Sequence, residues 1–123
     1  MNINVQTKSG IPIYEQIERQ IKDEIVGGIL SEGEMLPSIR GLAADLKISV
    51  ITVKRAYEDL EKEGMIYSVQ GKGFYVDNPD LDYIKEKKTL GLEERLTDWV
   101  EAAKNSGMNK QDALDMLGIL WDD

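Results

Sequence analysis

The side chains best suited to chemistry in this sequence are the basic and hydroxyl residues gathered between positions 38 and 57. That stretch holds four basic residues and one acidic residue, a local charge of +3, in a 123-residue chain whose net charge is −8. Lysine and arginine neutralise phosphates, and serine and threonine hydroxyls donate to phosphate oxygens. The residues indicate binding to a nucleic-acid backbone, although four bases could also simply solvate the face of a helix.

Ten residues are candidate contacts to nucleic acid. Two lie at the start of a first short helix, six at the start of a second helix, and two at the tip of a hairpin. They are Ser38, Arg40, Ser49, Val50, Ile51, Thr52, Lys54, Arg55, Gly71 and Lys72. Val50 and Ile51 offer apolar contact to thymine methyl groups, so part of the base readout is expected to be apolar. The arginines and Lys54 are expected to carry the charged contacts.

Catalytic chemistry has little support in the sequence. The chain has no Cys and no His, which removes the thiol and imidazole groups that serve as nucleophiles, bases and metal ligands. The adjacent carboxylates Glu93-Glu94 and Asp122-Asp123 diverge by about 100° on a helix and do not converge on one substrate. No glycine-rich phosphate loop opens a helix after a strand. We therefore expect no catalytic residues, no metal site and no cofactor, and an enzyme is the weakest of the alternatives.

Two short helices joined by a tight turn are expected to position the candidate contacts. Ser38 can cap a first helix that runs to about Leu46, residues 47–48 make the turn, and Ser49 can cap the second helix. The apolar stripe of the second helix has helical spacing and comprises Val53, Ala56, Tyr57 and Leu60. With this stripe against the core, the N-terminal end of the second helix is exposed. A recognition helix contacts base edges from that end.

Further elements flank these two helices. An amphipathic helix with a stripe of isoleucines is predicted over residues 13–26, and two glycines end it. Strands are predicted at residues 65–69 and 74–76, around a turn whose glycines can adopt positive φ. Ile3 and Val5 alternate with polar residues, which predicts a short edge strand before the first helix.

The C-terminal part is predicted to be a separate helical segment. Asn78-Pro79 marks the boundary, so residues 11–79 form one expected domain and residues 80–123 the other. A helix is predicted from about residue 80 to 106, with Gly91 as a point where it could be interrupted, and a second from Asn109 to Trp121.

Two short amphipathic helices cannot bury all the apolar side chains of this C-terminal segment by themselves. We expect a second copy of the chain to cover them, because two-fold dimers match two half-sites on DNA. The expected dimerisation residues are Leu92, Leu96, Trp99, Ala103, Leu117, Leu120 and Trp121. The alternative is that the tail packs on the N-terminal domain, with Trp99 and Trp121 as ordinary core residues.

Residues 11–76 resemble the winged helix-turn-helix domain of the GntR family of bacterial transcription regulators. The residues that carry the resemblance are Pro12-Ile13-Tyr14-Glu15-Gln16-Ile17, Leu36-Pro37-Ser38, Arg40, Leu42-Ala43, Leu46, Ser49, Thr52-Val53, Ala56, Leu60, Glu63-Gly64 and Gly71-Lys72-Gly73. The short remainder resembles the small YtrA-like subfamily. The likeness therefore covers nearly the whole chain.

The resemblance implies a mainly α fold with a small β-hairpin wing, followed by a short two-helix dimerisation segment. It implies a bacterial, cytoplasmic repressor that binds a palindromic, double-stranded DNA operator as a homodimer, and in this subfamily the targets often include transporter operons. Because only about 44 residues follow Pro79, a small-molecule effector stays uncertain. No stretch approaches the roughly 20 apolar residues of a spanning helix, so no membrane partner is expected.

Three positions depart from the family pattern. Val50 stands where many relatives carry Arg, which favours less guanine readout. Gly41 stands where an acid commonly closes a capping box with Ser38, and Lys47 replaces a turn Gly at a cost of about 1 kcal/mol if its φ is positive. The net charge of −8 and the apolar Val50-Ile51 pair favour one alternative function, a winged-helix protein-interaction module without DNA binding.

Overall fold

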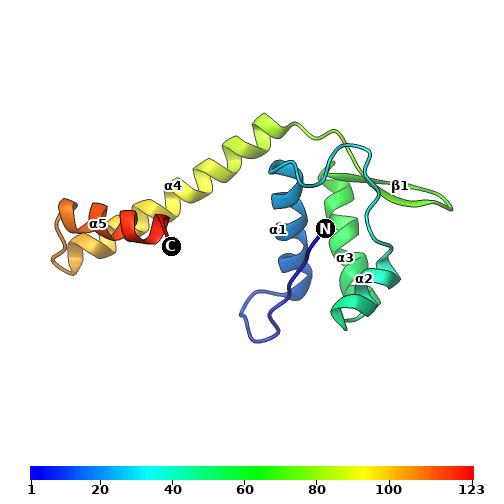
Figure 1. The fold of residues 1–123 in the computed structure, drawn as a ribbon, viewed down its shortest axis with the longest axis horizontal. Coiled ribbons are helices and arrows are strands. Elements are labelled where there is room, and N and C mark those ends of the chain that lie inside the picture. The colour runs from blue at the N-terminus through cyan, green and yellow to red at the C-terminus, as the bar shows by residue number, and fades with distance from the viewer. The chain divides into compact units, whose positions relative to one another are not determined.

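The computed structural model describes all residues from Met1 to Asp123. It divides into two compact units, Met1–Leu81 and Asp82–Asp123. The first unit contains three helices and a two-stranded hairpin, and the second contains helices joined by a short connection (Figure 1). The predicted fold class, mainly α with a small hairpin, is confirmed.

The first unit is built around α3 (Val50–Lys62), which packs against α1 (Ile13–Val26), α2 (Ile39–Leu46) and the hairpin. The stripe predicted for α3 is fully buried and meets the isoleucine stripe of α1. The largest fully buried side chains are Tyr57, Ile17, Ile21, Leu36, Leu60, Met65, Ile66, Val53 and Val76. Burying an aliphatic or aromatic side chain contributes about 1.5–3 kcal/mol, so this apolar core holds α3 in place.

Both helix starts of the predicted helix-turn-helix are confirmed. The Ser38 hydroxyl oxygen accepts from the Gly41 backbone N–H at 3.0 Å, and the Ser49 hydroxyl oxygen accepts from the Thr52 N–H at 3.3 Å. Lys47 ends α2 in the left-handed region, with φ 57° and ψ 47°. The tight turn therefore forms as expected. Its backbone is strained, because Lys47 occupies a left-handed position where glycine is usual.

The side chain of Tyr57 ties α3 to two other segments. Its hydroxyl donates to the backbone carbonyl of Pro37 at 2.8 Å, and its ring meets Phe74 edge-on at 5.0 Å. Burial raises the pKa of the Tyr57 phenol, which is fully protonated at neutral pH. One residue of α3 thus contacts both the entry to α2 and the second strand of the hairpin.

The hairpin consists of β1 (Ile66–Val69) and β2 (Gly73–Val76), paired antiparallel with Tyr67 opposite Tyr75. Gly71 and Gly73 adopt φ of 77° and 126°, as predicted for the turn. Residues 33–36 run beside β2, where the Leu36 N–H donates to the Phe74 carbonyl at 2.9 Å. The hairpin is further joined to α3, because the N–H and hydroxyl of Ser68 both donate to the Glu61 carboxylate, at 3.0 and 2.7 Å.

The predicted edge strand near the N-terminus was wrong. Residues 1–6 form no strand, and side chains of α1 take the place of a partner strand. The backbone N–H groups of Asn2, Asn4 and Gln6 donate to the side chains of Glu24, Gln20 and Gln16, at 3.0, 2.9 and 2.8 Å. One helical turn, about 5.4 Å, nearly matches the spacing of alternate residues in an extended chain. The alternation in the sequence reflects the buried Ile3 and not a sheet.

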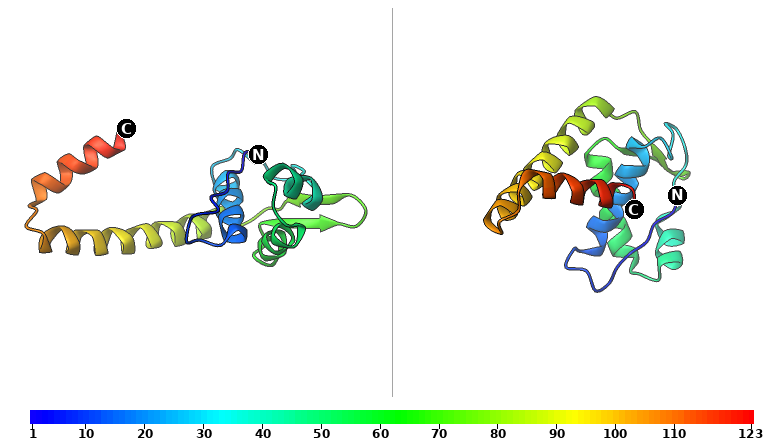
Figure 2. Two further views of the ribbon diagram at one scale, coloured as in Figure 1. Left: turned by 90° about the horizontal axis from the view of Figure 1, so that it is seen from below. Right: turned by 60° about the vertical axis from the view of Figure 1, so that its left-hand side comes forward.

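The second unit consists of most of α4 (Leu81–Asn105) and of α5 (Lys110–Trp121). Helix α4 is continuous through Gly91, so the possible interruption does not occur. Asn109 and Asp112 form the expected capping box at the start of α5, with bonds of 2.8 and 3.2 Å. Figure 2 shows α5 turning back from the end of α4, so that the two helices open into a V.

Candidate nucleic-acid interface

The N-terminal half of α3 presents the candidate contacts to solvent. Val50 and Ile51 are 44% and 78% exposed. Lys54 and Arg55 are exposed one turn further along, and Thr52 is half-buried. The helix therefore has a fully buried face and an exposed face that combines two apolar side chains with two cations.

The two serines serve as helix caps and keep a donor. Each hydroxyl oxygen of Ser38 and Ser49 accepts a backbone N–H, while both residues remain exposed. A serine hydroxyl can accept and donate at the same time, so its own proton is available for a phosphate oxygen. The caps thus lock the two helix starts and leave a donor at each one.

The cations differ in what they contact. Lys54 lies 3.8 Å from the Glu58 carboxylate, an exposed pair that contributes little. The Arg55 guanidinium lies over the ring of Tyr14, with Cζ at 3.8 Å from the ring centroid. Arg40, Lys47 and Lys72 form no ion pair and are exposed. The positive charge of this surface is therefore not neutralised by neighbouring acids, except at Lys54.

The ten candidate residues do not all lie together. Eight come from α2, α3 and their caps, at the helix-turn-helix. Gly71 and Lys72 lie at the tip of the hairpin, which projects away from α3 (Figure 1). The glycine bears no Cβ and nothing lies within 4 Å of where one would be. The hairpin tip is thus open to solvent and separate from the other candidate residues.

An acidic pair, the buried Glu18 and the half-buried Asp59, lies where α3 packs against α1. Glu18 is buried, its side chain hydrogen-bonds Asp59, and its Oε1 has no hydrogen-bond partner. Burial, followed by the hydrogen bond and charge of Asp59, raises the pKa of Glu18 from 4.5 to about 8, while Lys22 opposes the shift. Glu18 is therefore mostly protonated at neutral pH, and the folded domain is less negative than its formal charge.

The residue that sequence reasoning missed is Tyr14. Its spacing placed it beside the apolar stripe of α1, and no pattern along the chain indicates that it contacts Arg55 of α3. Such a contact between two helices becomes visible only once both are packed. No group of three or more potential metal-ligating side chains comes together in the structure, and no helix is both long and apolar enough to span a membrane.

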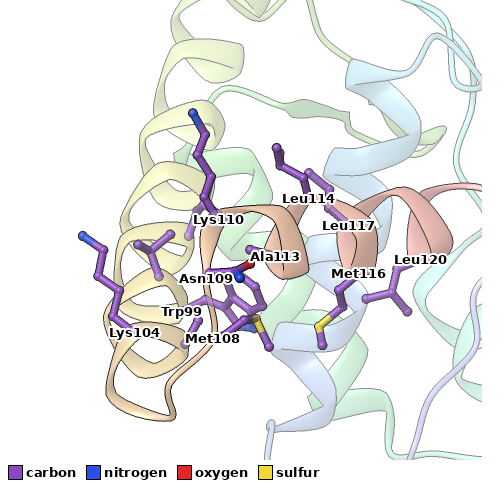
Figure 3. A pocket seen from close by; sticks show the side chains of 13 residues that line it. Trp99, Lys104, Met108, Asn109, Lys110, Ala113, Leu114, Met116, Leu117 and Leu120 are labelled. Atoms are coloured by element: carbon purple, nitrogen blue, oxygen red, sulfur yellow. The ribbon is translucent and has the colours of Figure 1, made fainter.

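The second unit carries an open apolar groove between α4 and α5, with a volume of about 480 Å³. Five of the seven predicted dimerisation residues line it, and Ala103 is the one among the seven that is buried. These five are Leu96, Trp99, Ala103, Leu117 and Leu120. Leu92 and Trp121 lie outside the groove and are 60% and 81% exposed. Figure 3 shows Trp99, Met108 and Met116 inside the V, with Lys104 and Lys110 extending away from it.

Comparison with known proteins decides the family. The sequence profile of "Bacterial regulatory proteins, gntR family" matches residues 13–76. This chain belongs to the GntR family. It is a transcription regulator with a DNA-binding winged helix-turn-helix domain, and not an enzyme.

Individual relatives agree with this assignment. The chain is 35% identical over 106 residues to the HTH-type transcriptional repressor YtrA of Bacillus subtilis, covering 86% of this chain and 82% of that protein. A GntR family transcriptional regulator from Listeria monocytogenes superposes with a TM-score of 0.70 and 31% identity, over 90% of this chain and 96% of that one. The resemblance to the small YtrA-like subfamily is thus confirmed.

A second similar structure contains DNA. It is AraR(DBD) in complex with operator ORX1, with a TM-score of 0.55 and 28% identity, over 62% of this GntR-family chain and 95% of that one.

Proposed function

We propose that this GntR-family regulator is a repressor that binds a palindromic, double-stranded DNA operator as a homodimer. In this proposal residues 11–79 bind DNA and residues 80–123 join two copies. The observation that carries it is the exposed, cationic N-terminal half of α3, where Val50, Ile51, Lys54 and Arg55 face solvent on a helix whose opposite face is fully buried. A recognition helix enters the major groove from this end.

The residues proposed to contact the operator are the ten exposed or half-buried side chains and backbone positions described above. Arg40 and Lys54 are assigned to phosphates or base edges, Val50 and Ile51 to thymine methyl groups, and Lys72 with Gly71 to the flanking backbone. The similarity to a family member bound to an operator supports this assignment. Because the chain carries a net charge of −8, non-specific affinity should be low.

The proposed dimer accounts for the uncovered apolar face of α4 and α5. Leu114, Leu117, Leu120 and Trp121 are at least half exposed, and a contiguous apolar surface of this kind marks an interaction site. A second copy places two recognition helices about one helical turn of DNA apart, roughly 34–36 Å. Control of a transporter operon rests on the subfamily likeness alone, and a cytoplasmic location follows from the proposed DNA target.

Selection from a random pool of double-stranded DNA tests the function. We expect recovered sequences to contain a palindrome, and binding to weaken steeply between 50 and 200 mM salt. Arg40→Ala combined with Lys54→Ala should weaken binding and reduce the salt slope by about two. Lys85→Ala combined with Arg95→Ala, which removes the same two charges from exposed positions of the second unit, is the matched control. If the Arg40 and Lys54 double variant bound with the same affinity and the same salt slope, the alternative of an interaction module without DNA binding would replace this proposal.

A further inference from the structure

The stacking of Arg55 on Tyr14 joins two helices that have different places in the proposed interface. Arg55 belongs to α3 and is exposed, whereas Tyr14 belongs to the first turn of α1 and is half-buried. The guanidinium carbon lies 3.8 Å from the ring centroid, well within the range of a cation–π contact. Arg55 forms no ion pair, so the ring is the contact that holds its charged group.

This contact leaves the hydrogen-bonding capacity of Arg55 available. A guanidinium attracted to the face of a ring spends none of its five N–H donors on an oxygen acceptor. An arginine side chain that is already held loses less conformational freedom when it binds a phosphate than a freely rotating one does. The Tyr14 ring therefore orients the guanidinium of Arg55 and leaves its N–H donors free to bind a phosphate.

Without the ring, two acids on α3 would compete for Arg55. Glu58 and Asp59 follow it by three and four residues, the spacings at which side chains of one helix meet. Lys54, which has no aromatic neighbour, lies 3.8 Å from Glu58 in this way. The direction of Arg55 thus differs from that of Lys54 because α1 presents an aromatic face to it.

We propose that Tyr14 is a positioning residue that holds Arg55 away from the acidic half of α3 and toward a DNA phosphate. Helix α1 then takes part in DNA binding through Arg55. This inference rests on the proposed function.

The test compares full-length variants on the DNA sequence recovered by selection, with affinity measured at several salt concentrations. Tyr14→Phe keeps the ring face and should bind as the wild type does. Tyr14→Leu keeps apolar bulk without the π system and should weaken binding by about five-fold. Arg55→Ala should weaken binding at least as much and reduce the salt slope by about one. Tyr14→Leu combined with Arg55→Ala should bind no more weakly than Arg55→Ala alone.

The double variant separates positioning from folding. If Tyr14→Leu acted by loosening the domain, its effect would multiply with that of Arg55→Ala, and its thermal unfolding midpoint would fall below the binding temperature. Either result would overturn the inference, as would wild-type affinity in Tyr14→Leu. Failure of the proposed function gives a different result, since the wild type itself would then select no DNA sequence.

Discussion

At the scale of single residues, Lys47 is the clearest conflict between the sequence and the backbone. The turn between α2 and α3 requires φ of 57° at this position, a value that side chains with a Cβ adopt at a cost. The helix nevertheless ends there, because the N–H groups of Lys47 and Ile48 donate to carbonyls of the last turn of α2.

Replacing Lys47 with Gly should therefore raise the free energy of unfolding by about 0.5–1 kcal/mol, since glycine adopts this conformation without steric strain. Urea denaturation, followed by the loss of helical signal in far-UV circular dichroism, measures the change. Lys47→Ala loses the same charge while keeping the strain, so it should give no such gain. Equal stabilisation by both variants would assign the effect to charge.

Tyr57 illustrates the opposite case, a residue whose chemistry fits its surroundings. Its hydroxyl donates to Pro37 at 2.8 Å inside the core. Tyr57→Phe keeps the edge-on contact with Phe74 but leaves the Pro37 carbonyl without this donor, which should cost about 1–2 kcal/mol of stability. The thermal midpoint of the variant should fall by several degrees, and an unchanged midpoint would show that water replaces the hydroxyl.

At the scale of elements, the packing of α1 on α3 contains a titrating pair. Lys22 forms an ion pair with Glu63, while Glu18 shares a hydrogen bond with Asp59. The folded state holds a proton on Glu18 up to about pH 8, whereas the unfolded chain loses it near pH 4.5. Folding is therefore linked to proton uptake between these two values.

The unfolding free energy should accordingly fall as pH rises from about 5 to 8 and then level off, as far as Glu18 controls it. Glu18→Gln mimics the protonated side chain and should flatten this profile, with wild-type stability near pH 5 and greater stability near pH 8.5. Urea titrations at three pH values measure it. As a control, Glu101→Gln removes an exposed carboxylate and should show the pH profile of the wild type. If the profiles of the wild type and Glu18→Gln were parallel, the pH dependence could not be assigned to Glu18.

The elements also show which parts of the structure the sequence could predict. The caps at Ser38, Ser49 and Asn109 are predictable because each bond joins residues three apart. The continuity of α4 through Gly91 was open, since one glycine costs about 1 kcal/mol and the rest of the helix decides whether that is tolerated. The contact of Arg55 with Tyr14 and the side-chain partners of residues 2–6 depend on packing between distant segments, and no local pattern encodes them.

At the scale of the whole molecule, self-association is the property on which the proposed function depends. The apolar groove between α4 and α5 is open, and most large apolar side chains of these helices are exposed. Burying such side chains against a second copy contributes about 25 cal/mol per Å² of apolar surface before the costs of association.

Leu120→Glu should weaken this association while leaving the monomer folded, because Leu120 is 64% exposed in a single chain. A buried charge facing the partner should weaken the dimer by roughly 3 kcal/mol, about a hundred-fold, and should weaken operator binding with it. Sedimentation equilibrium measures the mass. Asn105→Glu adds the same charge to the same unit and should remain dimeric. A monomeric wild type would contradict the dimer, and it would favour the alternative that the tail packs on the N-terminal domain.

The double attachment of Ser68 to Glu61 has a consequence for protein engineering. Together with the contacts of Tyr57, it joins the C-terminal half of α3 rigidly to the hairpin. A chimera that receives the whole recognition helix of another regulator would lose these attachments. The set of residues that can be exchanged is smaller than the whole helix. It consists of the solvent-facing positions 50, 51, 54 and 55. Transplanting only these four side chains should change which DNA is chosen without disturbing the frame that presents them.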